Sequence, residues 1–161
     1  MAESIQARVS RIVQATPVHD IHTHLYDPAQ GELLLWGIDD LLVYHYLVSE
    51  ASRQMEVPLE RFWSASKAEQ AELVWQALFI DHSPVSEACR GVLTTLNRLG
   101  IEPRKNDLAS LRQWYAAQKP AAFIDRLMQT ANLASICMTN SPLDPVNGPP
   151  GTGGSPAIPA S

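Results

Sequence analysis

Residues 18–25 read VHDIHTHL, and the interpretation of the whole chain depends on this short stretch. Its pattern predicts a strand, and side chains alternate between the two faces of a strand. One face therefore carries an aspartate and two histidines, which are Asp20, His22 and His24. His19 falls on the opposite face, where we expect it to be structural or exposed.

The two histidines on one face are candidate metal ligands. Side chains at positions i and i+2 of a strand point the same way, so His22 and His24 could hold one divalent cation, most simply zinc, at about 2.0–2.1 Å. Asp20 could orient one imidazole through its second nitrogen. A catalytic zinc needs at least three protein ligands, and a histidine pair also arises by chance. A structural role for the pair therefore stays open.

The sequence on either side of this strand is largely helical. Residues 3–15 carry apolar side chains at helical spacing, and Pro17 ends that helix. The pattern from residue 31 to residue 130 predicts helices almost throughout. Residues 133–139, LASICMT, predict a second buried strand. A sheet of two strands is marginal alone, so this order is typical of the first third of a larger α/β protein.

Several sequence signals mark the ends of the expected helices. Residues 66–69 form a capping box, and Ser83 followed by Pro84 is typical of a helix start. Asp107 is a further N-cap candidate, and Gly100 is a natural helix stop.

The end of the chain differs in composition from the rest. Half of the 12 prolines and half of the 8 glycines lie in residues 142–161. Such a segment buries too little apolar surface to offset its ordering entropy, so we expect residues 145–161 to be a disordered tail. The abrupt change after Asp144 also suggests a shifted reading frame. Residues 1–144 then form the ordered part.

Charge and hydropathy exclude several classes of partner. The formal net charge of −5 argues against nucleic acid, which binds basic surfaces, and against an anionic membrane. The most apolar stretch, residues 33–48, is interrupted by Asp39 and Asp40, so we expect no membrane span. The N-terminus lacks an apolar signal region. Two cysteines without metal-type spacing are typical of free thiols in the cytoplasm.

Four segments in order resemble the uronate (glucuronate) isomerase family of the amidohydrolase superfamily. VHDIHTHL resembles the first strand of that family, and LLLWGIDDLLVYHYLV resembles its following helical region, with His45 and Tyr46 at a His-Tyr pair. FIDHSPVSEACRGVLTTLNRLG resembles a helix that begins at a loop histidine, here His82. LMQTANLASICMTNSPLDP resembles the second strand of the family. The resemblance covers residues 15–145 and the N-terminal third of such a protein.

The resemblance implies the fold and the chemistry. The fold would be the start of a metal-dependent (β/α)8 barrel, with two strands and a large helical insertion. The activity would be the interconversion of a hexuronate, such as glucuronate, with its keto form, fructuronate. His22 and His24 would bind the metal, Tyr46 and His45 would act in catalysis, and His82 would touch the substrate.

The chain departs from the family pattern at several positions. The family segment D-H-Y-x-W-R corresponds to residues 44–49 here, so Val48 and Ser49 replace a tryptophan and an arginine. An arginine can grip a carboxylate with two hydrogen bonds, which serine cannot do. On the second strand, Asn140 and Ser141 replace two acidic residues. Since Tyr44 and Tyr46 are two positions apart on an expected helix, we expect them to face different ways.

Three interpretations follow from these residues. The first is a uronate isomerase-like chain that acts on a small sugar acid in the cytoplasm and is inactive as a fragment. The second is another metal-dependent activity on the same scaffold, a hydrolase or a decarboxylase. The third is a non-catalytic helical protein that binds a partner. Exposed apolar faces that a barrel would cover also predict self-association or a homo-oligomer.

Overall fold

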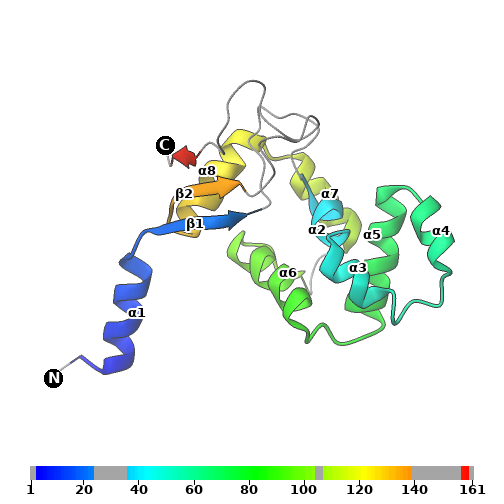
Figure 1. Ribbon diagram of the computed structural model, residues 1–161, viewed down its shortest axis with the longest axis horizontal. Helices are drawn as coiled ribbons and strands as arrows, with labels where there is room; N and C mark the ends of the chain where they lie inside the picture. The colour runs from blue at the N-terminus through cyan, green and yellow to red at the C-terminus, as the bar shows by residue number, and fades with distance from the viewer. Residues whose placement is uncertain (1–2, 24–35, 104–106, 139–156, 160–161) are drawn as a thin grey trace. The chain divides into compact units, whose positions relative to one another are not determined.

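The computed structural model describes residues 3–23, 36–103, 107–138 and 157–159 of the chain (Figure 1). These residues belong to two compact units. The first unit comprises residues 1–34 and 119–161, and the second comprises residues 35–118. No helix among the described residues is long and apolar enough to cross a membrane.

The first unit is a small sheet with two helices. Its elements are α1 (Ile5–Ala15), β1 (Val18–Thr23), α8 (Pro120–Thr130), β2 (Leu133–Met138) and β3 (Ala157–Pro159). The strand order is β1-β2-β3, with β1 parallel and β3 antiparallel to β2. Helix α8 packs against β2 through a small apolar cluster of Ile124, Met128 and Ile136, flanked by Leu133. Both predicted strands are therefore present and pair as parallel neighbours.

A turn with unusual backbone geometry connects α8 to β2. Asn132 has φ of 52°, a left-handed conformation that asparagine tolerates better than most residues. Its side-chain amide donates hydrogen bonds to the carbonyl oxygens of Gln14, at 3.2 Å, and Thr16, at 2.8 Å. Its carbonyl oxygen accepts the Val18 amide at 2.8 Å. Asn132 thus fastens the end of α1 and the start of β1 to the start of β2.

The pairing of β1 with β2 is irregular. Asp20 pairs with Ile136 and Thr23 pairs with Met138, so three steps on β1 match two steps on β2. Such a bulge interrupts the strict alternation of side chains along a strand. Within this irregular stretch His22 is exposed, whereas Asp20 is half-buried. Simple alternation of side chains, which the sequence predicts, does not describe this part of the strand.

The second unit is helical. Its elements are α2 (Ile38–Leu42), α3 (His45–Ala51), α4 (Leu59–Ser64), α5 (Lys67–Trp75), the π-helix η2 (Gln76–Ile80), α6 (Glu87–Arg98) and α7 (Leu108–Ala116). Side chains from nearly all of these helices are fully buried in its core, including Ile38, Leu42, Phe62, Val74, Leu78, Leu96 and Leu111. The helical character predicted for residues 31–130 is confirmed in the described part of that range.

The helix caps show which sequence signals were reliable. The capping box is present, since the Ser66 hydroxyl accepts the Glu69 amide while the Glu69 carboxylate accepts the Ser66 amide. Asp107 caps α7 as predicted. The helix start predicted at Ser83 is wrong. Helix α6 begins at Glu87, because the Ser86 hydroxyl accepts the Cys89 amide at 3.1 Å and takes the N-cap position.

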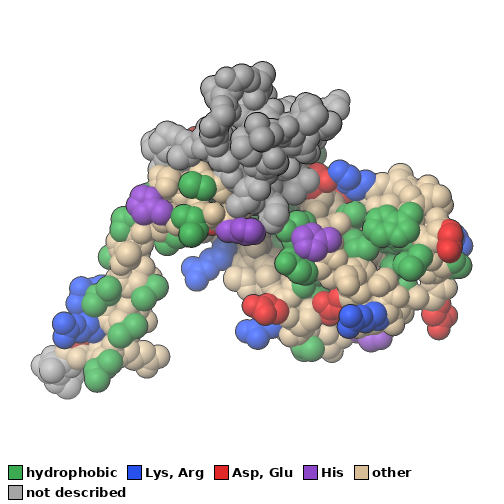
Figure 2. Space-filling model, in the orientation of Figure 1, with side chains coloured by type: hydrophobic (Ala, Val, Ile, Leu, Met, Phe, Trp, Pro, Cys, Tyr) green, Lys and Arg blue, Asp and Glu red, His purple; other side chains and the backbone are tan. Residues whose placement is uncertain are grey.

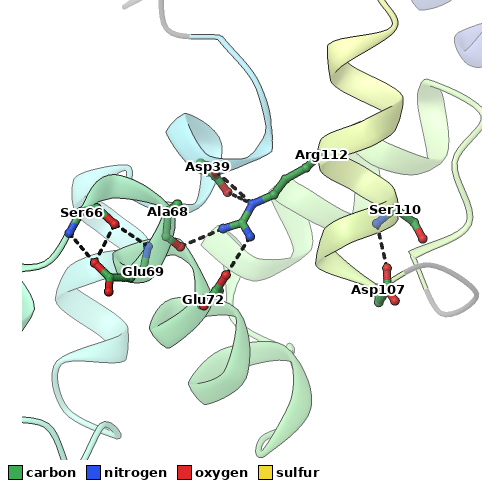
Figure 3. A network of polar contacts seen from close by, with 8 residues as sticks. All are labelled: Asp39, Ser66, Ala68, Glu69, Glu72, Asp107, Ser110 and Arg112. Carbon is green, nitrogen blue, oxygen red and sulfur yellow. Dashed lines mark hydrogen bonds and ion pairs between the residues drawn. The ribbon is translucent and has the colours of Figure 1, made fainter.

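Arg112 joins three helices of the second unit (Figure 3). Its Nε donates to the Asp39 carboxylate of α2, at 2.9 and 3.1 Å. Its Nη1 donates to Glu72 of α5 at 2.8 Å, and its Nη2 donates to the Ala68 carbonyl oxygen at 2.8 Å. The guanidinium side chain is 29% exposed, so these bonds are partly shielded from water. They fix α7 against α2 and α5.

Strand β3 lies within the segment for which the sequence predicts disorder. Three backbone pairs, from Ser135 with Pro159 to Cys137 with Ala157, join it to β2. The sequence pattern does not predict this strand. The other residues of the expected tail lie outside the described part of the chain.

Candidate functional site

His22 is the predicted metal ligand that the structure describes, and it lies on β1 in an exposed position. Its backbone amide donates a hydrogen bond to Oδ1 of Asp20 at 3.0 Å. One oxygen of the Asp20 carboxylate is therefore engaged with the strand backbone. The role predicted for this carboxylate from the sequence was to orient an imidazole. His24, the second predicted ligand, lies outside the described residues.

The donor set in the described residues falls short of a metal centre. Among these residues no group of three or more histidine, cysteine, aspartate or glutamate side chains lies close enough to hold a metal ion. Imidazole is a suitable ligand for zinc, but a catalytic zinc needs three protein ligands. The described part of the chain therefore does not form a metal site by itself.

His19 has a structural contact across the sheet. Its Nδ1 lies 2.8 Å from the Ser135 hydroxyl, which belongs to β2, at a position where the two residues are register partners. The side chain is exposed. The expectation that His19 is structural or exposed is confirmed.

In the second unit, His45 and Tyr46 lie together with Tyr44 at the start of α3. The His45 ring centroid lies 4.3 Å from that of Tyr44 and 4.1 Å from that of Tyr46, with the planes tilted by 47° and 45°. His45 is exposed, and Tyr46 is 64% exposed. Tyr44 is half-buried, and its burial, with a smaller effect of the nearby Tyr46, raises the pKa of its phenol. The three rings thus form one aromatic cluster, in which His45 and Tyr46 are exposed and Tyr44 is half-buried.

A hollow of about 450 Å³ opens beside this cluster. It is lined by Tyr46, Ser49, Glu50, Arg53 and Gln54. Ser49 is the position at which the family pattern expects an arginine. Arg53 lies four residues later, and side chains at i and i+4 of a helix are neighbours on its surface. A guanidinium is therefore available in the same hollow as the Tyr46 phenol.

Arg53 is not among the site residues that the sequence predicts. The signal that could have found it is the i+4 spacing from Ser49 on a helix that carries the His-Tyr pair. That signal is weak, because α3 ends at Ala51 and Arg53 lies in the turn that follows. Only the folded turn, with the Arg53 amide bonded to the Glu50 carbonyl oxygen at 3.2 Å, keeps the residue beside the hollow.

Glu50 in the same hollow is attached to the next helix. Its Oε2 accepts a hydrogen bond from the Ser86 hydroxyl at 2.7 Å. The same hydroxyl caps α6 by accepting the Cys89 amide. Through this hydroxyl, Glu50 secures α3 to α6.

The Cys89 thiol in the same helix is buried. Its burial raises the pKa of the thiol, which keeps it neutral and unreactive.

His82 lies after the π-helix η2, as a loop residue, and is exposed. Its Nδ1 lies 2.8 Å from the carbonyl oxygen of Ala77. With Nδ1 as the donor, the ring satisfies a carbonyl group near the end of η2. This contact gives His82 a structural role, while a substrate contact stays a prediction.

A second hollow in the helical unit measures about 720 Å³ and has charged walls. Most of these charged groups have structural partners, since Arg112 binds Glu72 while Glu69 and Asp107 accept bonds at helix starts. Hydrogen bonds to the capping carboxylates lower the pKa values of both Glu69 and Asp107. This hollow is therefore part of the structural network of Figure 3.

The predicted site residues are divided between the two units. His22 belongs to the first unit, and His45, Tyr46 and His82 belong to the second. The described contacts bring His45 and Tyr46 together. The roles predicted for these four residues and for His24 stay predictions.

The fold and these residues define a class of protein. Two parallel strands joined by a long helical segment, with a histidine-bearing first strand, form part of an α/β protein. A uronate isomerase from Bacillus halodurans C-125, solved by crystallography, is similar to this chain, with a TM-score of 0.84 and 46% sequence identity. The match covers 91% of this chain and 36% of that chain. The resemblance to the uronate isomerases is thereby confirmed, over about a third of the length of such a protein.

Other comparisons give no match. No protein-family model and no curated protein matches this chain. The barrel itself is not present in the described residues, where the sheet has three strands.

Proposed function

We propose that this chain carries part of the active site of a uronate isomerase. The observation that carries the proposal is the 46% identity and the TM-score of 0.84 with the Bacillus halodurans uronate isomerase. In this proposal the two parallel strands are the first two strands of a (β/α)8 barrel, and the helices between them form an insertion. Active sites of such barrels are assembled from the ends of several strands.

The proposed reaction is an aldose–ketose isomerisation of a hexuronate, with glucuronate and fructuronate as the pair. A base removes the proton from C2, and a proton is returned to C1. The C2 hydroxyl becomes the carbonyl group, and the C1 carbonyl becomes a hydroxyl, so no atom is gained or lost. A positioned acid–base group accelerates such proton transfers by about 10²- to 10⁴-fold.

His45 and Tyr46 are the residues proposed to handle the protons. Their rings lie 4.1 Å apart and both side chains are exposed, so a substrate in the adjoining hollow could reach the phenol and the imidazole. His82 is proposed to touch the substrate through Nε2, while Nδ1 stays at the Ala77 carbonyl oxygen.

Arg53 is proposed to bind the substrate carboxylate. It lines the same hollow as Tyr46 and Ser49, and a guanidinium can bind a carboxylate through two parallel hydrogen bonds. It would take over the task that the family pattern gives to the position of Ser49. The neighbouring Glu50 is bonded to Ser86 and is thus held toward α6.

His22 and His24 are proposed to contribute to a divalent metal site, with zinc as the metal. A bound metal would supply Lewis acidity that polarises a carbonyl oxygen. Further ligands would have to come from polypeptide outside the described residues. The chain alone is therefore proposed to be inactive, and the complete assembly to act on sugar acids in the cytoplasm.

A chimera tests this function directly. The segment of the Bacillus halodurans uronate isomerase that this chain matches is replaced by this chain, and glucuronate conversion is followed by ¹H NMR. We expect isomerisation, and we expect Tyr46→Phe to lower kcat by about 10²-fold or more. Tyr115→Phe removes the hydroxyl group of a buried tyrosine on α7, in the same unit, and is the matched control for kcat. A folded chimera without isomerase activity would contradict the proposal.

A further inference from the structure

The N-terminal helix α1 presents an apolar face that nothing in the described structure covers. Ile5, Val9, Ile12 and Val13 lie at positions i, i+4, i+7 and i+8, which share one side of a helix. Their exposed fractions are 83%, 53%, 48% and 66%. No residue of α1 is buried, and Figure 2 shows the hydrophobic side chains along the helix. These four residues are called the α1 face below.

Helix α1 is too short to be stable in water without packing against other polypeptide. Helices shorter than about 12–15 residues are marginal in water, and most helices in proteins gain stability from packing an apolar face. Helix α1 has 11 residues, an N-cap bond from the Ala7 amide to the Ser4 hydroxyl and one exposed ion pair between Glu3 and Arg11. These contacts contribute little. The α1 face is therefore shaped for a partner that covers it.

Strand β1, which follows α1 in the chain, also carries exposed apolar side chains. Val18 is 44% exposed and Ile21 is 78% exposed. In the described sheet β1 is the terminal strand, with β2 as its neighbour. Apolar side chains on a terminal strand favour the addition of further polypeptide. Helix α1 and β1 follow one another in the chain, and hydrogen bonds join the end of α1 and the start of β1 to Asn132. These bonds hold the two elements that carry the exposed apolar side chains.

We propose that the α1 face is a docking surface for the polypeptide that supplies the rest of a uronate isomerase fold. The similar solved chain is longer, and nearly two-thirds of it lies outside the match. That unmatched polypeptide is the partner to which the similarity points. The inference rests on the structural similarity and not on the proposed catalytic residues, so it stands even if the isomerase activity fails.

The test is reconstitution from two polypeptides. This chain and the unmatched part of the Bacillus halodurans uronate isomerase are refolded together, so that neither has to be stable alone. The mass of the product is then measured by size-exclusion chromatography with light scattering. We expect a complex with one copy of each. Hydrogen exchange of the α1 amides is expected to slow by tenfold or more in the complex.

Single substitutions locate the surface. Val9→Asp places a charge in the α1 face and is expected to weaken the complex by tenfold or more. Ser10→Asp places the same charge on the neighbouring residue, outside that face, and is the matched control. Val9 is exposed, so its substitution leaves the chain folded, which circular dichroism checks. Absence of a complex, equal effects of the two substitutions, or a homodimer of this chain through the same face would each overturn the proposal.

Discussion

The rings of Tyr44 and Tyr46 meet edge to face, with centroids 5.6 Å apart and planes at 62°. Two residues at i and i+2 of a continuous helix point about 200° apart and do not meet. The contact exists because Tyr44 lies at the N-cap of α3, with extended backbone at φ of −64° and ψ of 139°. The expectation that the two tyrosines face different ways is therefore wrong.

Removing the Tyr44 ring should release its neighbours. In Tyr44→Ala the imidazole of His45 loses one of its two ring contacts, at 4.3 Å. We expect the His45 ring protons to shift in ¹H NMR, because aromatic rings shield nearby protons. We also expect the free energy of unfolding to fall by about 1 kcal/mol, as is usual for an aromatic pair. Tyr44→Phe keeps the ring and should leave the His45 ring signals close to their original positions. Unchanged His45 signals in Tyr44→Ala would contradict the arrangement.

The guanidinium of Arg112 should be a main support of the helical unit. Arg112→Met keeps most of the side-chain length and removes the bonds to Asp39, Glu72 and the Ala68 carbonyl oxygen. Hydrogen bonds to charged groups contribute about 1.5–3 kcal/mol each, and Asp39 would lose its partner while half-buried. We expect the free energy of unfolding, measured with urea, to fall by about 2–3 kcal/mol. This is the contribution of a single such bond, because solvent reaches the site and weakens the others.

Arg61→Met is the matched control for Arg112→Met. Arg61 lines the same hollow but is exposed, and surface substitutions of this kind change stability by about 0.5 kcal/mol or less. Equal losses for the two variants would show that the network contributes nothing specific.

The capping box should make α5 sensitive to acid. Bonds from the Ser66 hydroxyl and amide lower the pKa of the Glu69 carboxyl below its usual value of 4.5. Because the folded pKa is the lower one, the stabilisation is present above the usual pKa and is lost as the pH falls through the folded pKa. In Ser66→Ala we expect the pKa of Glu69 to rise toward 4.5, as measured by NMR titration of its side-chain carboxyl carbon.

Asp107 serves as the internal reference in that titration. Its pKa is lowered by the bonds from Ser110, which Ser66→Ala leaves intact. A parallel shift of both carboxyl groups in the variant would point to general unfolding and not to loss of one cap.

The sequence predicted what depends on local chemistry. The capping box at Ser66, the N-cap at Asp107 and the two strands near residues 18 and 133 are each set by side chains close together in sequence, and all are confirmed. The helix start at Ser83 was misplaced because Ser86, three residues later, offers the same hydroxyl and is also held by Glu50. The hydroxyl groups of Ser83 and Ser86 are equivalent helix-start signals in the local sequence. Only the contact of Ser86 with Glu50, which is distant in sequence, distinguishes them.

The candidate site could be predicted only in part for the same reason. The His45–Tyr46 pair is adjacent in sequence, so its proximity was assured. The bulge beside His22 depends on pairing with β2, more than a hundred residues away, and alternation along one strand cannot reveal it. Arg53 reaches the hollow only through the turn that follows α3.

Arg53 should determine recognition of the substrate carboxylate in the chimera. Because a charge-assisted bond to a carboxylate contributes about 1.5–3 kcal/mol, we expect Arg53→Ala to raise KM for glucuronate by about 10- to 100-fold. The proton transfers do not involve this residue, so kcat should change far less. Arg53→Lys keeps the charge but not the paired bonds. Its KM should therefore lie between those of the parent chimera and of Arg53→Ala. Arg98→Ala, at an exposed position on α6, should leave KM unchanged. A KM for Arg53→Ala equal to that of the parent chimera would show that the carboxylate is bound elsewhere.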